Sequence, residues 1–347
     1  MEAILCGASA LDYWRRHPEL LGDSYSSRRT APLRKGNIPV DTPSAEIVNE
    51  LATMSLVSPS DAHLLVTSTR ARRKIHGVTC TVCSGPFPAN SFVRAMAQVY
   101  VPRPELLFLL LARHLSFVRL LEVGFEICGT YRLAGGVATY DAPPLASVAS
   151  ICDYANRATG LHGRKNALRA AQWLVDGSGS PAETALAIVL GLPYRHGGYG
   201  LGGFQLNREL QLNESAARIL GRTTIRPDFY WPTAKHPAEY DSAQYHSTRE
   251  QADYDERRRN AYDAMGMSVT VFRSRHLVDF SLMDEMACSI RKNIGMRTTP
   301  VPAGYAYLKS DLLEEAFRSW VDLRDEYGTG EEFLARSAAW SEPPYLW

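Results

Sequence analysis

Cysteine is scarce in this sequence, and its spacing does not suit a disulfide-rich fold. Six cysteines are spread over 347 residues, at positions 6, 80, 83, 128, 152 and 288, whereas disulfide frameworks are dense and compact. The one close pair, Cys80 and Cys83, stands alone. A structural zinc site would need two more ligands, and His76 is the nearest candidate. We expect buried thiols at this pair.

Long apolar runs are also absent, which argues against a membrane-spanning helix. The most apolar stretch, 106–111, is closed by Arg113 and His114, far short of the roughly 20 residues that cross a bilayer. The first ten residues lack the basic start and the apolar run of a signal peptide. We therefore expect a soluble, cytoplasmic protein without a membrane partner.

The sequence has no excess of charge of either sign. Its 38 basic and 37 acidic residues give a formal charge of +1, so any contact with nucleic acid must come from local clusters. Basic clusters lie at 28–29, 34–35, 70–74 and 257–259. Clusters of this kind are most often solvated surface, so none identifies a nucleic-acid site by itself.

Length and composition predict a globular protein of more than one domain. A chain of 347 residues with 45% hydrophobic residues supplies ample core. Helical and strand-like patterns alternate along it, without internal repeats, which favours the α/β class. We expect four parts, namely an N-terminal α/β or α+β domain over 1–142, a helical connector over 143–178, a second α/β domain over 179–295 and an acidic helical tail over 296–347.

Local patterns predict individual elements within these parts. The N-terminal half is expected to contain a helix over 9–16, strands over 64–67 and 77–83, a buried helix over 104–121, and connector helices over 145–159 and 163–175. An alternating segment at 204–212 predicts a strand or hairpin arm. The Gly-dense stretch 197–203 lacks the Lys-Ser/Thr of a phosphate-binding loop, so we interpret it as a flexible loop.

Carboxylates gather at the ends of two predicted strands. Asp228 precedes the aromatic run 229–231, a strand that Pro232 closes. A second strand at 238–241 carries Glu239 and Asp241 on one face. Oxygen ligands of this kind hold a hard divalent cation such as Mg²⁺ or Mn²⁺, which activates water and stabilises charge on a phosphate.

This region resembles the PD-(D/E)XK nuclease superfamily. Pro227-Asp228 matches its P-D element and Glu239 its second acidic position. The resemblance is closer to the very-short-patch-repair endonuclease-like group, whose members often have the motif E-x-D-G-x-x-H. Glu239 and Asp241 match that motif, while Ser242 replaces the Gly and Tyr245 stands where the His is expected, with His246 one place later.

The helix expected over 248–265 is similar to that group's D-x-x-R helix, through Asp255 and Arg258, and the strand at 268–273 also fits. The resemblance implies a restriction-endonuclease-like mixed sheet flanked by helices, and a metal-dependent endonuclease acting on DNA. It implies Asp228 and Glu239 as metal ligands, with Asp241 completing the site or holding its outer shell. The expected nucleic-acid contacts are Arg226, Arg257 and Arg258.

Glu183 has two interpretations. Ser180, Pro181 and Glu183 form a predicted capping box, in which Glu183 accepts a hydrogen bond from the Ser180 backbone amide. In the nuclease-like interpretation, Glu183 matches the acidic residue on the first helix of the domain, which joins the metal site through space.

The sequence departs from the superfamily pattern at Asp241, which stands where a lysine that orients or deprotonates water is usual. Lys235 could supply that cation if the strand were regular, and His246, which titrates near neutral pH, is the other candidate base. Two functions stay open, namely a DNA endonuclease, and a non-catalytic DNA-binding or antitoxin-like regulator that retains a nuclease-like fold.

The N-terminal region resembles AbiE-type antitoxins and their relatives. The shared features are Ser9-Ala10-Leu11 in an early helix, and Val101-Pro-Arg-Pro-Glu105 opening a long helix. The resemblance implies a role in regulation or DNA binding. The alternative is a scaffold or oligomerisation domain, with a homodimer or another protein as partner.

Overall fold

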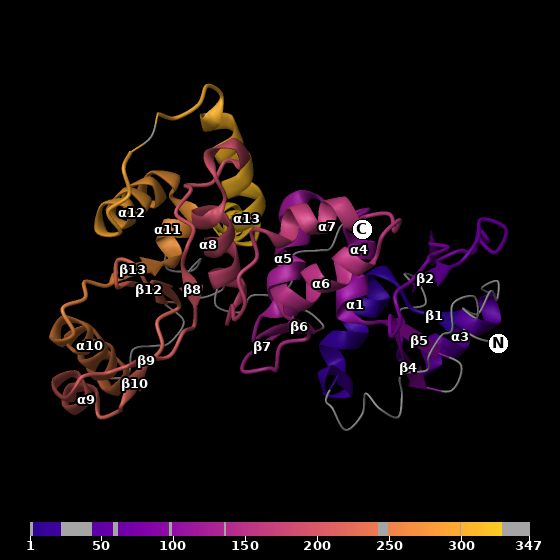
Figure 1. Cartoon of the computed structure of the whole chain (residues 1–347), viewed down its shortest axis with the longest axis horizontal. Coiled ribbons are helices and arrows are strands. Elements are labelled where there is room, and N and C mark those ends of the chain that lie inside the picture. The colour runs from indigo at the N-terminus through magenta and orange to yellow at the C-terminus, as the bar shows by residue number, and fades with distance from the viewer. Residues whose placement is uncertain are drawn as a thin grey trace. The chain divides into compact units, whose positions relative to one another are not determined.

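The computed structural model describes residues 3–21, 44–57, 62–96, 99–134, 137–241, 249–298 and 300–327, except for the side chains of 249–252 and 319–327 (Figure 1). Helices alternate with small mixed sheets, which confirms the α/β class. The chain forms two compact units: unit 1 takes the described residues of Met1–Cys128 and Ala142–Leu174, and unit 2 those of Gly129–Asp141 and Val175–Tyr345. None of the described helices combines the length and apolar character needed to cross a bilayer.

Unit 1 begins with short strands around an early helix. Its first elements are β1 (Ala3–Ile4), α1 (Gly7–Arg16), η1 (Pro18–Leu21), α3 (Ala45–Thr53), β2 (Ala62–Val66), β3 (Val78–Val82), β4 (Phe92–Met96) and β5 (Val99–Pro102). Strand β5 pairs in parallel with β1 and antiparallel with β4. Strands β2 and β3 form a parallel pair, and a bridge between Leu5 and Leu64 links β2 to the end of β1.

Four helices complete unit 1, namely α4 (Pro104–Leu111), α5 (Phe117–Cys128), α6 (Val148–Arg157) and α7 (Arg164–Ala171). The connector helices are confirmed, but the prediction of one helix over 104–121 was wrong. The chain leaves the helix after Ala112, where Arg113 donates from Nη1 to the carbonyl of Val82 at 2.9 Å. Ser116 then caps a new helix, because its Oγ accepts from the amide of Arg119 at 3.2 Å.

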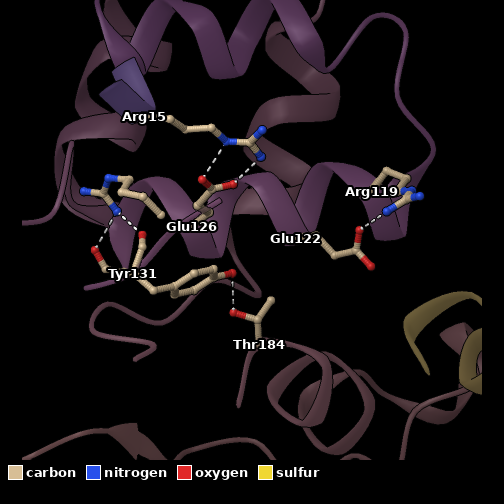
Figure 2. A network of polar contacts seen from close by, with 8 residues as sticks. Arg15, Arg119, Glu122, Glu126, Tyr131 and Thr184 are labelled. Atoms are coloured by element: carbon tan, nitrogen blue, oxygen red, sulfur yellow. Dashed lines mark hydrogen bonds and ion pairs between the residues drawn. The ribbon is translucent and has the colours of Figure 1, made fainter. Parts of the chain in front are cut away.

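A buried ion pair joins α1 to α5 inside unit 1. Arg15 donates from Nε and Nη2 to the two carboxylate oxygens of Glu126, each at 2.8 Å (Figure 2). The side chains are only 4% and 2% exposed. Beside Arg15 in the sequence, the fully buried Trp14 donates from its indole nitrogen to the carbonyl of Pro102 at 2.7 Å. Polar contacts therefore fix α1 within an apolar core.

Unit 2 is built around a four-stranded sheet. Its elements are β6 (Arg132–Ala134), β7 (Val137–Thr139), α8 (Pro181–Gly191), η2 (Tyr194–His196), β8 (Gln205–Leu206), β9 (Leu210–Gln211), α9 (Glu214–Leu220), β10 (Thr224–Ile225), β11 (Phe229–Trp231), β12 (His236–Asp241), α10 (Arg249–Ala264), β13 (Thr270–Arg273), α11 (Ser274–Val278), α12 (Phe280–Asn293) and α13 (Tyr305–Tyr327). The sheet order is β13-β12-β11-β8, in which β12 and β13 are parallel and the other pairs antiparallel.

The alternation of segment 204–212 predicts one continuous element, but the structure divides it into two short strands that belong to different sheets. Strand β8 joins the main sheet, whereas β9 leaves it and pairs with β10, with α9 between them. In Figure 1, α9 and α10 lie near β9 and β10. An apolar cluster holds this part together, and its fully buried members include Ala216, Ala261 and Tyr262.

The Gly-dense stretch 197–203 packs against helices on both of its sides. Gly197 has a φ of +83°, and a Cβ there would lie 2.1 Å from the carbonyl oxygen of Leu308 in α13. The amides of Tyr199 and Leu201 donate to carbonyls of α8, at 3.0 and 2.7 Å. The glycines therefore allow a close approach of backbones, which explains the stretch without a role in phosphate binding.

Candidate active site

The hairpin of β11 and β12 brings two predicted metal ligands together. Phe229 pairs with Ala238 in the antiparallel register, so Asp228, one residue before β11, lies opposite Glu239. Residues opposed in this way project to the same face of a sheet. The amide of Tyr240 donates to Oδ2 of Asp228 at 2.7 Å, which fixes the carboxylate at the end of the hairpin remote from its turn.

The Asp228 carboxylate lies in surroundings that oppose its charge. Burial, followed by repulsion from Glu183 and Glu239, raises the pKa of Asp228 well above its ordinary value. The Tyr240 amide and the Arg258 guanidinium lower that pKa, but by less. Carboxylates from α8 and β12 thus act on the one that precedes β11. Clustering of this kind is typical of functional sites.

Glu183 is held at the start of α8 by several donors. Ser180 caps the helix, because its Oγ accepts from the Glu183 amide at 3.2 Å. The Glu183 carboxylate accepts from the amide of Gly179 at 2.8 Å, the hydroxyl of Ser180 at 2.9 Å and Nδ2 of Asn207 at 2.5 Å. The backbone amide that it satisfies is thus that of Gly179, and not that of Ser180 as the capping box predicts. Burial still raises the pKa of Glu183.

Glu239 turns towards α10. Its Oε1 accepts from Nη2 of Arg258 and from the hydroxyl of Tyr262, the latter at 2.7 Å. Burial and then the charge of Glu239 raise the pKa of Tyr262, so the phenol keeps its proton and remains a donor. Nη2 of Arg258 also donates to the carbonyl of Arg226 at 3.0 Å, while its Nε is buried without a hydrogen-bond partner among the described residues.

Two further predicted residues are placed away from the carboxylates, and a third lies outside the described residues. Asp241 lies 3.4 Å from Nε of Arg273 in an exposed pair, and no described contact joins it to Asp228. Lys235 has a φ of +50° in the turn before β12, so it does not belong to a regular strand, and the structure does not bring it to the carboxylates. His246, with Ser242 and Tyr245, lies outside the described residues.

The predicted nucleic-acid contacts differ in their surroundings. Arg258 faces the carboxylates, as described above, and exposed Arg226 donates from Nε to the carbonyl of Asn207 at 3.1 Å. Arg257 lies over the ring of Tyr254, which Arg222 also contacts. Clusters 28–29 and 34–35 lie outside the described residues. The structure thus brings Arg226 and Arg258 to the acidic site and Arg257 to an exposed arginine–tyrosine stack.

Two residues of the site were missed by sequence reasoning. Tyr262 follows Arg258 by four positions on α10, so helical spacing already places both on one face. Asn207 has a φ of +49°, a conformation that Asn tolerates better than most residues, and links Glu183 to the carbonyl of Gly177 at 3.1 Å. Its role depends on contacts across the fold, and no local signal identified it.

The donor set can be tested against the divalent cation that the nuclease resemblance implies. Carboxylate oxygens suit Mg²⁺ or Mn²⁺, and Oδ1 of Asp228 has no hydrogen-bond partner among the described residues. The other carboxylates are engaged with Arg258 or with the start of α8, and within the described ranges no three His, Cys, Asp or Glu side chains are arranged to hold a metal. The atom types suit the ion, and Asp228 and Glu239 are the residues that would hold it, although Arg258 already occupies one oxygen of Glu239.

The pair Cys80 and Cys83 is confirmed as buried thiols. Burial raises the pKa of both, so neither is a thiolate at neutral pH and neither is suited to nucleophilic chemistry. This leaves the carboxylate cluster of unit 2 as the candidate site.

Comparisons with known proteins do not assign this site to a family. No protein-family model, no curated protein and no solved structure matches the chain. The functional conclusion therefore depends on the chemistry of the residues themselves.

Proposed function

We propose that unit 2 is a metal-dependent endonuclease that hydrolyses phosphodiester bonds in DNA. One observation carries the proposal: the Asp228 carboxylate is partly buried, and its desolvation, followed by the charges of Glu183 and Glu239, raises its pKa. Such an arrangement disfavours the folded state unless a cation or a proton relieves it. Costly charge of this kind is retained at functional sites more often than in structural cores.

The element order supports the proposal. Helix α8 is followed by β8, β11, β12, α10 and β13, the order expected for the nuclease-like core, apart from the insertion of β9, α9 and β10. Strands β12 and β13 run in parallel on either side of α10 in the sequence. This connection leads the chain from Glu239 to Arg258 and back into the sheet, so the helix residues reach the carboxylates.

Each residue has a role that its contacts suggest. Asp228 and Glu239 would hold the cation, which would stabilise charge on the phosphate and activate water. Arg258, whose side chain is 23% exposed, adds positive charge beside the carboxylates, where a phosphate would lie. Tyr262 orients Glu239 through its hydroxyl. Glu183, with its three donors, supports the site from α8.

The test is cleavage of DNA by the purified full chain in Mg²⁺ or Mn²⁺, with a chelator control and with both single-stranded and duplex substrates. Wild type is expected to nick or cut, and Asp228→Asn is expected to lose at least about 100-fold in rate, the scale of removing one charge-stabilising group. Asp311→Asn, an exposed position on α13, is the matched control and should cleave like wild type.

A non-catalytic DNA-binding protein is the second candidate. The Arg258–Glu239 ion pair favours it, because the guanidinium already neutralises one expected metal ligand. Equal background cleavage by wild type and Asp228→Asn, together with DNA binding by both, would replace the enzyme proposal with this one.

A further inference from the structure

A long part of unit 1 carries basic residues without acidic ones. Residues 62–104 contain five arginines and one lysine, and no Asp or Glu. The whole chain is almost neutral at +1, so this segment concentrates positive charge. It spans β2, β3, β4 and β5. A local excess of this kind creates a field that attracts anions even on a neutral protein.

The excess is greatest in the loop between β2 and β3. Arg70, Arg72, Arg73 and Lys74 are all exposed. No ion pair to any of them occurs among the described residues. Arg103, in contrast, lies 3.6 Å from a carboxylate oxygen of Glu105. We call the exposed segment 70–74 the basic loop.

The basic loop is anchored to the core of unit 1. Between its exposed cations, Ala71 is only 3% exposed and packs with Val66 and Cys80. The amide of Ala71 donates to the backbone carbonyl and to Oγ of Ser68, both at 3.2 Å. The Cys80 thiol donates to the carbonyl of Arg73 at 3.8 Å. The cations therefore project from a backbone whose position is set by packing, which lowers the entropy lost when they bind.

We propose that the basic loop is a docking site for the phosphate backbone of duplex DNA. Three of its four cations are arginines, whose planar guanidinium groups match phosphate oxygens in pairs. The loop and the residue after it offer no exposed apolar side chain for insertion into a lipid surface, because Ala71 is buried and Ile75 is partly buried, so a membrane would gain only electrostatic attraction to its anionic headgroups. The loop binds DNA independently of base sequence, since phosphate contacts position a protein but do not specify bases.

The inference rests on the proposed function in one respect, because it takes DNA as the partner. It adds that unit 1 contributes to binding, in addition to the carboxylate site of unit 2. The test measures equilibrium binding of the full chain to a labelled DNA duplex over a range of salt concentrations, in a chelator so that cleavage does not interfere. Arg72→Gln with Arg73→Gln is compared with wild type.

Each phosphate contact contributes about 0.9 to the slope of log affinity against log salt. The double variant should therefore show a slope shallower by about 2 and an affinity lower by on the order of 10- to 100-fold at roughly 0.1 M salt. Lys292→Gln with Arg297→Gln is the matched control. It removes the same charge from two exposed positions, one in the last turn of α12 and one in the segment after it, and should leave the slope unchanged.

An unchanged slope in the loop variant, or an equal loss in the control, would overturn the inference. Loop-dependent binding to phosphatidylserine vesicles without binding to DNA would also overturn it. The two proposals fail separately: binding through the basic loop without cleavage refutes only the activity, and cleavage with loop-independent binding refutes only the loop.

Discussion

Two arginine–glutamate ion pairs in this protein differ in how fully their polar atoms are hydrogen-bonded and buried. In unit 1, Arg15 and Glu126 meet through two hydrogen bonds of 2.8 Å, with both side chains almost fully buried. In unit 2, Arg258 meets Glu239 through one nitrogen only, with side chains 23% and 19% exposed. The first pair satisfies both carboxylate oxygens, whereas the second leaves the Nε donor of Arg258 without a described partner. We call the Arg15–Glu126 pair the closed pair and the Arg258–Glu239 pair the open pair.

The neighbours of the two pairs differ as well. Beside Glu239 lies Asp228, whose pKa is raised by burial and by the carboxylates around it, so the second pair belongs to a cluster with surplus negative charge. A closed pair of unit charges fixes the fold around it. An open pair with surplus charge retains the capacity to bind something else. The difference supports a structural role for the first pair and is consistent with the proposed site around the second.

The largest effect is expected from breaking the closed pair. Glu126→Gln keeps the shape of the side chain but leaves the buried Arg15 without its counter-charge, which typically costs about 3–5 kcal/mol. Denaturant-induced unfolding of the full chain should show this as a lower midpoint. Glu122→Gln on the same helix is the control, since Glu122 pairs with Arg119 at 2.8 Å in a more exposed position (Figure 2) and should cost about 1 kcal/mol or less.

A similar cost for both variants would show that burial does not distinguish these pairs. The structural role of the Arg15–Glu126 pair would then have to be given up.

A smaller effect is expected from removing the hydroxyl that supports the open pair. Tyr262→Phe keeps the buried ring but deletes the hydrogen bond of 2.7 Å to Glu239, and bonds to charged groups are worth about 1.5–3 kcal/mol. Tyr131→Phe is the control, because the hydroxyl of Tyr131 meets the neutral Oγ1 of Thr184 at 2.9 Å (Figure 2). It should cost only about 1 kcal/mol.

Denaturant unfolding midpoints of Tyr262→Phe and Tyr131→Phe, each compared with wild type, measure the two costs. Equal costs would mean that Glu239 carries no charge that Tyr262 stabilises. The open pair would then lose its place in the proposed site.

Local sequence signals predicted the elements that carry the site, and they did so for physical reasons. Pro232 cannot continue a ladder and ends β11. Ser180 and Pro181 start α8, since one caps and the other has its φ preset for a helix. Asp228 and Glu239 then face each other because the register of β11 and β12 requires it. These features depend on neighbours close in the sequence.

Features that depend on distant segments were not predictable in the same way. The sequence did not predict that Arg258 pairs with Glu239 while Asp241 pairs with Arg273. The choice depends on how α10 packs against the sheet, which no spacing on the helix determines. Gly197 was interpreted as part of a flexible loop. Its close approach to Leu308 joins residues far apart in the chain, so local sequence could not predict it.

The smallest effect, and the one that bears most directly on the open pair, is a gain in stability from Asp228→Asn. The pKa of Asp228 is higher in the folded protein than its ordinary value, so between these two values the folded state binds the proton more strongly than the unfolded state. Stability therefore falls as pH rises through that window. Asparagine carries no such charge and still offers an oxygen to the Tyr240 amide, so the variant escapes this loss.

We expect the variant to match wild type in acid, below the ordinary pKa of Asp, and to exceed it at neutral pH by on the order of 1 kcal/mol. Unfolding midpoints measured across this pH range test the prediction, with Asp311→Asn, an exposed substitution on α13, as the matched charge control. Addition of Mg²⁺ should then stabilise wild type more than the variant, because a ligand stabilises only the state that binds it. A variant that is less stable than wild type at neutral pH would mean that compensating contacts stabilise the charge of Asp228. The cluster around the open pair would then have no surplus negative charge for a cation to relieve.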